Sequence, residues 1–247
     1  MSRGAAFAIG LGLAALHVAA SATADDDTTA RRQSLEPYFR DYRPNGPGPF
    51  PAILLVSGCN GFAPRTAPRI YTDLAEGWRA RGYVVVFVDY LAARGMNRCP
   101  SIAPADLGKD VLAVASYLQT QPLVDPERVS AIGWSLGGSG VLAALDPIEP
   151  GERSPLHAVV AYYPVCGTLE PWRAKVRTLV LMGANDKMAL PAICQQLFAR
   201  LPPDTPLETR VYADAGHGFN LPEPPPSRYN AAATAAAARD VDQFLSR

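Results

Sequence analysis

The sequence lacks an excess of charge of either sign, because 23 lysines and arginines balance 23 aspartates and glutamates. It also has no run of basic residues. Proteins that bind nucleic acid or an anionic membrane surface usually carry such a run or patch. The composition therefore predicts neither nucleic acid nor a membrane as a partner.

Long apolar runs are scarce, and the longest lies at the N-terminus. Arg3 precedes an apolar stretch over residues 5–20, and Ala22-Thr23-Ala24 supplies small residues for cleavage before Asp25. This pattern is typical of a secretory signal peptide over residues 1–24. The stretch is short for a membrane span, and no later segment is long enough to cross a bilayer. We expect a mature protein that is secreted or periplasmic.

Cys-x-x-Cys pairs are absent, so the four cysteines do not resemble a zinc site. The sequence predicts neither a metal nor another cofactor. In an oxidising compartment an even number of cysteines predicts two disulfides, with three possible connectivities. The cysteines are Cys59, Cys99, Cys166 and Cys194.

Internal repeats and linkers are also absent, and 247 residues with 48% hydrophobic content suffice for one large domain. We assign it to residues 44–247. Before it, residues 25–43 begin with a polar, flexible stretch and end in a possible edge strand. Apolar runs alternate with helical patterns, which predicts an α/β fold with a doubly wound, mostly parallel sheet. The expected strands are 52–56, 83–88, 129–132, 158–162, 178–182 and 207–212; the expected helices are 68–81, 104–119, 141–145, 191–200 and 231–245.

A G-x-S-x-G motif at residues 133–137 follows one of these strands and precedes a helix. In that context the serine, Ser135, takes a strained turn conformation that exposes its hydroxyl as a nucleophile. The alternative of a phosphate-binding loop fails, because that loop needs a lysine and Gly138 is followed by Ser139.

Histidine is rare, and only one of three can act as the base. His17 lies in the predicted signal peptide, and His157 begins a strand at the wrong end of the sheet. His217 follows the last strand, where sites form in such sheets. We therefore expect His217 to exchange a proton with Ser135.

Three aspartates follow strands and could orient His217. Asp186 gives the chain order Ser-Asp-His of an α/β-hydrolase triad and is favoured. Asp214 remains a rival from the same loop as His217, where it could also cap a turn. Asp89 better suits hydrogen bonds within its own loop.

An oxyanion hole requires two backbone amides near the nucleophile. One is expected from Leu136, directly after Ser135. The other is expected from Cys59, in the loop after the first central strand.

The chain resembles the dienelactone hydrolase family of α/β-hydrolases from about Pro44 to its C-terminus. The resemblance implies a cofactor-free hydrolase of esters or lactones. It differs from the namesake enzymes, which have a cysteine where Ser135 stands and a glutamate where Gly58 stands, so a serine esterase is expected. The matching residues are Gly58-Cys59-Asn60-Gly61, Arg94-Gly95 with Cys99, Gly133 to Gly138, Tyr163-Pro164, Asp186 and Gly216-His217-Gly218-Phe219.

In this fold the strands before Cys59 and Cys99 should be neighbours in the sheet, and so should the strands before Cys166 and Cys194. The expected disulfides are therefore Cys59–Cys99 and Cys166–Cys194. Only 15 residues separate Tyr163 from the next strand, which is too few for a cap domain. A shallow pocket walled by loops follows from this. Its expected lining is Arg94, Trp134, Trp172 and Phe219.

These expectations describe an exported serine hydrolase that cleaves small carboxylic esters or lactones through an acyl-enzyme. Two alternatives remain. A non-catalytic binding protein of the same fold would be favoured by loss of a triad residue, and a peptidase would usually carry an additional domain.

Overall fold

The computed structural model describes residues 26–62, 69–96, 102–149, 151–222 and 229–247. The predicted signal peptide and Cys99 lie outside these residues. The fold is a seven-stranded sheet in the order β1-β3-β2-β4-β5-β6-β7, in which only β1 is antiparallel. This confirms the predicted doubly wound, mostly parallel sheet. The strands are β1 Phe39–Tyr42, β2 Phe50–Val56, β3 Val84–Val88, β4 Val124–Trp134, β5 Ala158–Tyr162, β6 Arg177–Gly183 and β7 Leu207–Tyr212.

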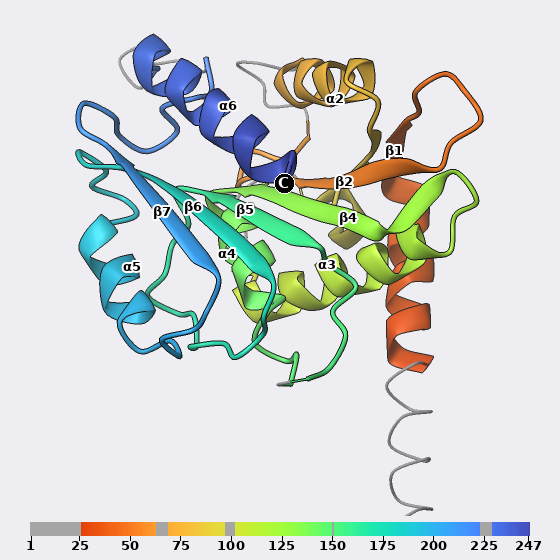
Figure 1. Ribbon diagram of the computed structural model, residues 1–247, viewed down its shortest axis with the longest axis horizontal. Helices are drawn as coiled ribbons and strands as arrows, with labels where there is room; N and C mark the ends of the chain where they lie inside the picture. Colours follow the sequence, from red (N-terminus) through yellow and green to blue (C-terminus); the bar gives the residue numbers. More distant parts are fainter. Residues whose placement is uncertain (1–25, 63–68, 97–101, 150, 223–228) are drawn as a thin grey trace, which may run out of the picture.

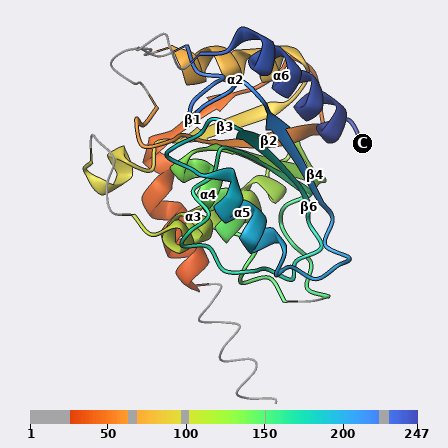
Figure 2. The same ribbon diagram turned by 90° about the vertical axis from the view of Figure 1, so that its left-hand side faces the viewer.

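Helices cover both faces of the sheet. Figure 1 shows α2 and α6 above it and α3, α4 and α5 below it, and Figure 2 shows the same two layers from the side. The described helices are α2 Ile70–Ala80, α3 Pro104–Gln119, α4 Leu136–Ala143, α5 Pro191–Phe198 and α6 Ala231–Leu245, with short 3-10 turns η1 Glu36–Tyr38 and η2 Ala92–Arg94.

Within the sheet the central strands are mainly apolar because both of their faces are buried, whereas residues 125–128 at the start of β4 are mostly polar and lie toward solvent. Along β2, Leu54 and Val56 pack into the core that contains α3 and α4. The alternate residues Ile53 and Leu55 pack into the core that contains α2 and α6. Burying two faces requires continuous apolar runs, and this is why those runs identified the strands in the sequence.

The start of the described chain differs from expectation. Residues 25–33 were expected to be flexible, but residues 26–35 are helical. Arg31 pairs with the buried carboxylate of Asp110 at 2.8 Å, and Leu35 is 2% exposed. Arg32 in the same stretch pairs with Glu36. Two ion pairs and one buried leucine thus hold a stretch whose composition is mostly polar. The edge strand that follows is confirmed as β1.

The connection from β5 to β6 contains no cap domain. Residues 163–176 contain one turn, at residues 167–168, and no helix or strand. Cys166 within it forms the predicted disulfide with Cys194 of α5. The other predicted bridge, Cys59–Cys99, has one cysteine outside the described residues and stays a prediction.

The parallel register brings the functional loops to one edge. Val56 of β2 pairs with Gly133 of β4, and Gly183 of β6 pairs with Tyr212 of β7. The loops after these strands therefore start side by side. Within the described part of the chain, no helix has the length and apolar character needed to cross a membrane.

Candidate active site

Ser135 is the single residue between β4 and α4, and its backbone is strained. It has φ 52° and ψ −115°, a conformation that non-glycine residues rarely adopt. A Cβ on Gly133 would lie 2.2 Å from the Gly137 oxygen, and one on Gly137 would lie 2.2 Å from the Val56 oxygen. Both flanking positions therefore require glycine, which explains the motif by close backbone packing.

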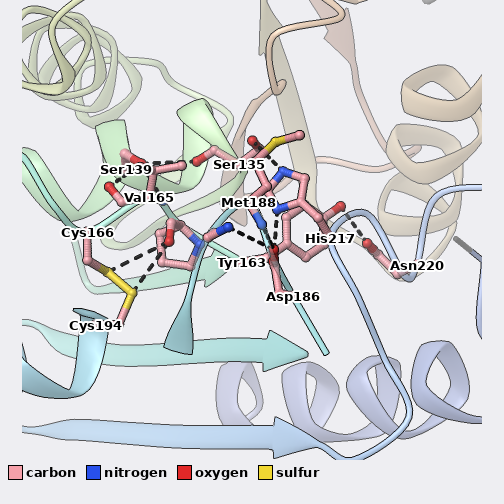
Figure 3. A network of polar contacts seen from close by, with 12 residues as sticks. Ser135, Ser139, Tyr163, Val165, Cys166, Asp186, Met188, Cys194, His217 and Asn220 are labelled. Atoms are coloured by element: carbon pink, nitrogen blue, oxygen red, sulfur yellow. Dashed lines mark hydrogen bonds and ion pairs between the residues drawn. A yellow bond between two sulfur atoms is a disulfide. The ribbon is translucent and has the colours of Figure 1, made fainter. Parts of the chain in front are cut away.

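Three side chains from three loops form a continuous hydrogen-bonded chain. The Ser135 hydroxyl lies 2.9 Å from His217 Nε2, and His217 Nδ1 lies 2.9 Å from Asp186 Oδ2 (Figure 3). Asp186 is 2% exposed. Its other oxygen accepts the amides of Met188 at 2.8 Å and Ala189 at 2.7 Å. Both carboxylate oxygens are thus satisfied, and one is fixed against the imidazole.

The rival residues lie elsewhere. Asp214 is exposed, and its described contact is its backbone oxygen with Asn230. Asp89 accepts the Ala92 amide at 3.0 Å within its own loop, as expected. His157 lies 3.1 Å from Arg177, and burial followed by this neighbouring charge lowers its pKa. Among the described residues, Asp186 and His217 are the pair that reaches Ser135.

Two buried tyrosines hold the loop that follows β2. The hydroxyl of Tyr90 donates to the backbone oxygens of Ser57 at 3.2 Å and Gly58 at 3.1 Å. On the other side, the Gly58 amide donates to the hydroxyl of Tyr71 at 3.1 Å. Burial raises the pKa of Tyr90 above its usual range, so this hydroxyl remains protonated and can donate.

This loop lies against the nucleophile. An added Cβ on Gly58 would be 3.4 Å from the Ser135 Cβ. Cys59 comes next in the chain and lines the same cavity as Ser135. Leu136 is the first residue of α4, where amides have no partner within the helix. The two predicted oxyanion residues therefore both lie close to Ser135, one in the loop after β2 and one at the start of α4.

Tyr163 is a site residue that the sequence analysis left without a role. Its φ is 38°, and it is 1% exposed. Its ring meets the His217 ring edge-on at 4.8 Å between centroids, and its hydroxyl donates to Asn220 at 2.8 Å. Figure 3 shows it below the imidazole. A buried ring on a strained backbone thus packs against His217. In the sequence, only the Tyr163-Pro164 pair pointed to this residue.

A cavity of about 250 Å³ opens beside Ser135. Of the four side chains predicted to line it, only Trp134 does. Met188, which lines it too, was missed by sequence reasoning. Met188 lies in the loop of Asp186, where its amide donates to the Asp186 carboxylate, and no sequence pattern pointed to it. The described lining is Gly58, Cys59, Asn60, Tyr71, Trp134, Ser135, Tyr163, Met188, His217, Gly218 and Leu221.

The other three predicted lining residues point elsewhere. Trp172 is 1% exposed and packs against Phe198 of α5. Phe219 is fully buried between Tyr163 and Tyr212. Arg94 forms an ion pair with the buried Asp110 at 2.7 Å. All three residues lie in the predicted loops, but Trp172 and Phe219 pack into the core and Arg94 pairs with a buried carboxylate.

No group of three or more His, Cys, Asp or Glu side chains among the described residues is arranged to hold a metal ion. The chemistry available here is that of a hydroxyl, an imidazole and a carboxylate held in line beside a small cavity.

The fold and this site define an α/β-hydrolase. Residues 40–247 match the model of the dienelactone hydrolase family. The chain belongs to that family. It is also 31% identical over 101 residues to the thiohydrolase apmlB of Arthrinium phaeospermum. That match covers 39% of this chain and 32% of the relative, so the chain spans about a third of that protein.

Solved structures share the fold at low sequence identity. A candidate dienelactone hydrolase of Klebsiella pneumoniae subsp. pneumoniae superposes with a TM-score of 0.68 at 19% identity, covering 85% of this chain and 92% of that one. A dienelactone hydrolase-like promiscuous phosphotriesterase from metagenomic libraries gives 0.62 at 20%, covering 84% and 97%. Apo esterase 2 of Thermogutta terrifontis gives 0.58 at 18%, covering 84% and 88%.

Proposed function

We propose that this protein is an exported serine hydrolase that cleaves small carboxylic esters or lactones through an acyl-enzyme. The observation that carries the proposal is the chain of two 2.9 Å contacts from Ser135 through His217 to Asp186. A serine held this way can lose its proton as it attacks a carbonyl carbon.

In the first half of the reaction, Ser135 Oγ attacks the carbonyl carbon and His217 Nε2 takes its proton. Asp186 stabilises the imidazolium and keeps Nδ1 protonated. The amides of Leu136 and Cys59 receive the developing negative charge on the carbonyl oxygen. The tetrahedral intermediate then collapses, and His217 returns the proton to the departing alcohol oxygen.

In the second half, water attacks the acyl-enzyme and His217 takes its proton. Collapse frees the carboxylic acid and restores the Ser135 hydroxyl. For a lactone the alcohol stays attached to the acyl group, so the product of the same two steps is a hydroxy acid.

A substrate panel together with active-site labelling tests this function. We expect turnover of p-nitrophenyl acetate and butyrate, with a dienelactone, a thioester and a peptide amide run alongside. A fluorophosphonate probe should add to Ser135 in the wild type and not in Ser135→Ala. A protein that binds esters without turnover and resists the probe would be a non-catalytic member of the fold. Preference for the amide would make it a peptidase.

Export is the part of the proposal that rests on sequence alone. Residues 1–24 have the pattern of a signal peptide. Expression of the full chain in a bacterium should give a periplasmic protein beginning at Asp25. N-terminal sequencing of the fractionated protein measures this, and an uncleaved chain in the cytoplasm would contradict it.

A further inference from the structure

A second cavity, of about 510 Å³, adjoins the one beside Ser135. The two share His217 and Met188 as walls. Met188 is 61% exposed, so its side chain lies on the surface between the two cavities and is not part of the packed core. It can therefore change rotamer without disturbing the core. Figure 3 shows Met188 leading from the Asp186 loop toward the catalytic serine.

The two cavities differ in chemistry. The smaller one is lined mainly by aromatic and aliphatic side chains, including Tyr71, Trp134 and Leu221. The larger one is lined mainly by polar side chains from the loops after β6 and β7. These are Asn185, Lys187, Asp214, Tyr229 and Asn230.

Several of these polar groups are free to bind a ligand. The side chains of Asn185, Lys187, Asp214 and Tyr229 make no hydrogen bond or ion pair within the described part of the chain. All four residues are exposed, Tyr229 by 40%. They offer hydrogen-bond donors, acceptors and one open aromatic face.

The reaction itself decides which half of an ester each cavity takes. The carbonyl oxygen points to the amides of Cys59 and Leu136, so the acyl group occupies the smaller cavity. The departing oxygen must lie against His217, which gives it a proton. Because His217 is also a wall of the larger cavity, the leaving group extends into that cavity past Met188.

Opposite charges on Lys187 and Asp214 favour a neutral polar ligand over an anion or a cation. A polyhydroxylated molecule satisfies both donors and acceptors, because each hydroxyl can donate and accept. Its C–H faces can also pack on the Tyr229 ring. We propose that the larger cavity is the leaving-group subsite, and that the substrates are short-chain acyl esters of sugars or similar polyols.

The overall reaction is balanced by water. The acyl–oxygen bond of the sugar ester breaks, the sugar oxygen takes the proton held by His217, and water supplies the hydroxyl of the released acid. This inference rests on the proposed function and adds the identity of the leaving group.

The test compares two esters with the same acyl group, methyl 6-O-acetylglucoside and ethyl acetate. We expect kcat/KM for the sugar ester to be about ten-fold higher or more, the equivalent of one or two good hydrogen bonds. Tyr229→Ala and Lys187→Ala should each lower this ratio about three- to ten-fold. Lys109→Ala is the matched control, because Lys109 is an exposed lysine on α3 without an ion pair among the described residues. It should leave both the ratio and the activity unchanged.

The outcomes separate the two proposals. Wild type that cleaves p-nitrophenyl acetate but shows no preference for the sugar ester would overturn this inference and leave the proposed function standing. A preference that survives in both cavity variants would overturn the assignment of the cavity. Absence of all ester turnover and of Ser135 labelling would instead contradict the proposed function.

Discussion

Two buried aspartates in this molecule have almost the same surroundings and different consequences. Asp186 and Asp110 are 2% and 3% exposed, and in each the two carboxylate oxygens accept separate hydrogen bonds. Asp186 holds His217. Asp110 holds Arg31 with one oxygen and Arg94 with the other.

The difference lies in what the basic partner can do. His217 has a second nitrogen, which faces Ser135 beside a cavity and can take a proton. An arginine has no acceptor and stays protonated, so Arg94 can only donate, as it also does to the Tyr90 oxygen at 3.2 Å. A buried carboxylate with a basic partner is therefore a site only where that partner can change its protonation next to a nucleophile.

The largest effect is expected from variants that break the hydrogen-bonded chain from Ser135 through His217 to Asp186. His217→Ala should lower kcat for p-nitrophenyl acetate by about 10⁴- to 10⁶-fold, and Asp186→Asn by about 10⁴-fold, because the asparagine favours the wrong imidazole tautomer. Steady-state kinetics on folded protein measure both. Asp214→Asn is the control and should change kcat less than about three-fold; a larger loss there than in Asp186→Asn would transfer the acid role to Asp214.

A smaller effect concerns Tyr90. The Arg94 guanidinium donates to the backbone oxygen of Tyr90, and the Tyr90 hydroxyl holds the Gly58 loop. Tyr90→Phe should lower kcat about 10- to 100-fold with KM within about two-fold, because a displaced amide weakens stabilisation of the oxyanion. Tyr117→Phe makes the same chemical change away from this loop and should leave kcat unaltered. A rise in KM at constant kcat would show that Tyr90 acts on binding instead.

Asp110 should matter for stability alone. Asp110→Asn removes the charge that two arginines share and should cost about 3 kcal/mol of unfolding free energy. For a chain of this size Tm should fall by about 6–12 °C. Thermal unfolding and ester turnover measured on the same sample test the comparison directly. The exposed Asp106→Asn on the same helix should shift stability by about 0.5 kcal/mol or less. A large loss of kcat in Asp110→Asn at an unchanged Tm would refute a structural role.

The smallest effect concerns the cavity beside Ser135, since the cavity that Asp110 lines has a volume of only about 10 Å³. A volume of about 250 Å³ holds a short acyl chain. Each methylene beyond the first few should gain little of the ~0.8 kcal/mol that full burial provides. We therefore expect kcat/KM for p-nitrophenyl esters to peak at short acyl groups and then level off or fall. A steady rise to long chains would require a deep tunnel.

Sequence alone predicted the parts of this account that depend on local spacing. The strands were visible because a sheet covered on both faces requires continuous apolar runs. The order Ser135, Asp186, His217 was visible because each residue follows a strand at the same edge of the sheet.

The parts that depend on where side chains point were not predictable. Trp172 and Phe219 lie in the expected loops, but their side chains pack into the core. Arg94 forms an ion pair with Asp110 of α3, the next helix along the chain. The role of Tyr71 under the Gly58 loop follows from tertiary packing and leaves no sequence pattern. The helix over residues 26–35 was missed because ion pairs of Arg31 and Arg32 and the burial of Leu35 hold it, and these contacts leave no apolar pattern in the sequence.

The most direct test of the central claim is the ester turnover of Ser135→Ala. The variant keeps the fold, so circular dichroism should match the wild type while kcat for p-nitrophenyl acetate falls about 10⁴- to 10⁶-fold. If the purified, folded variant turned over the ester at the wild-type rate, Ser135 would not be the nucleophile and the account of the site would be wrong.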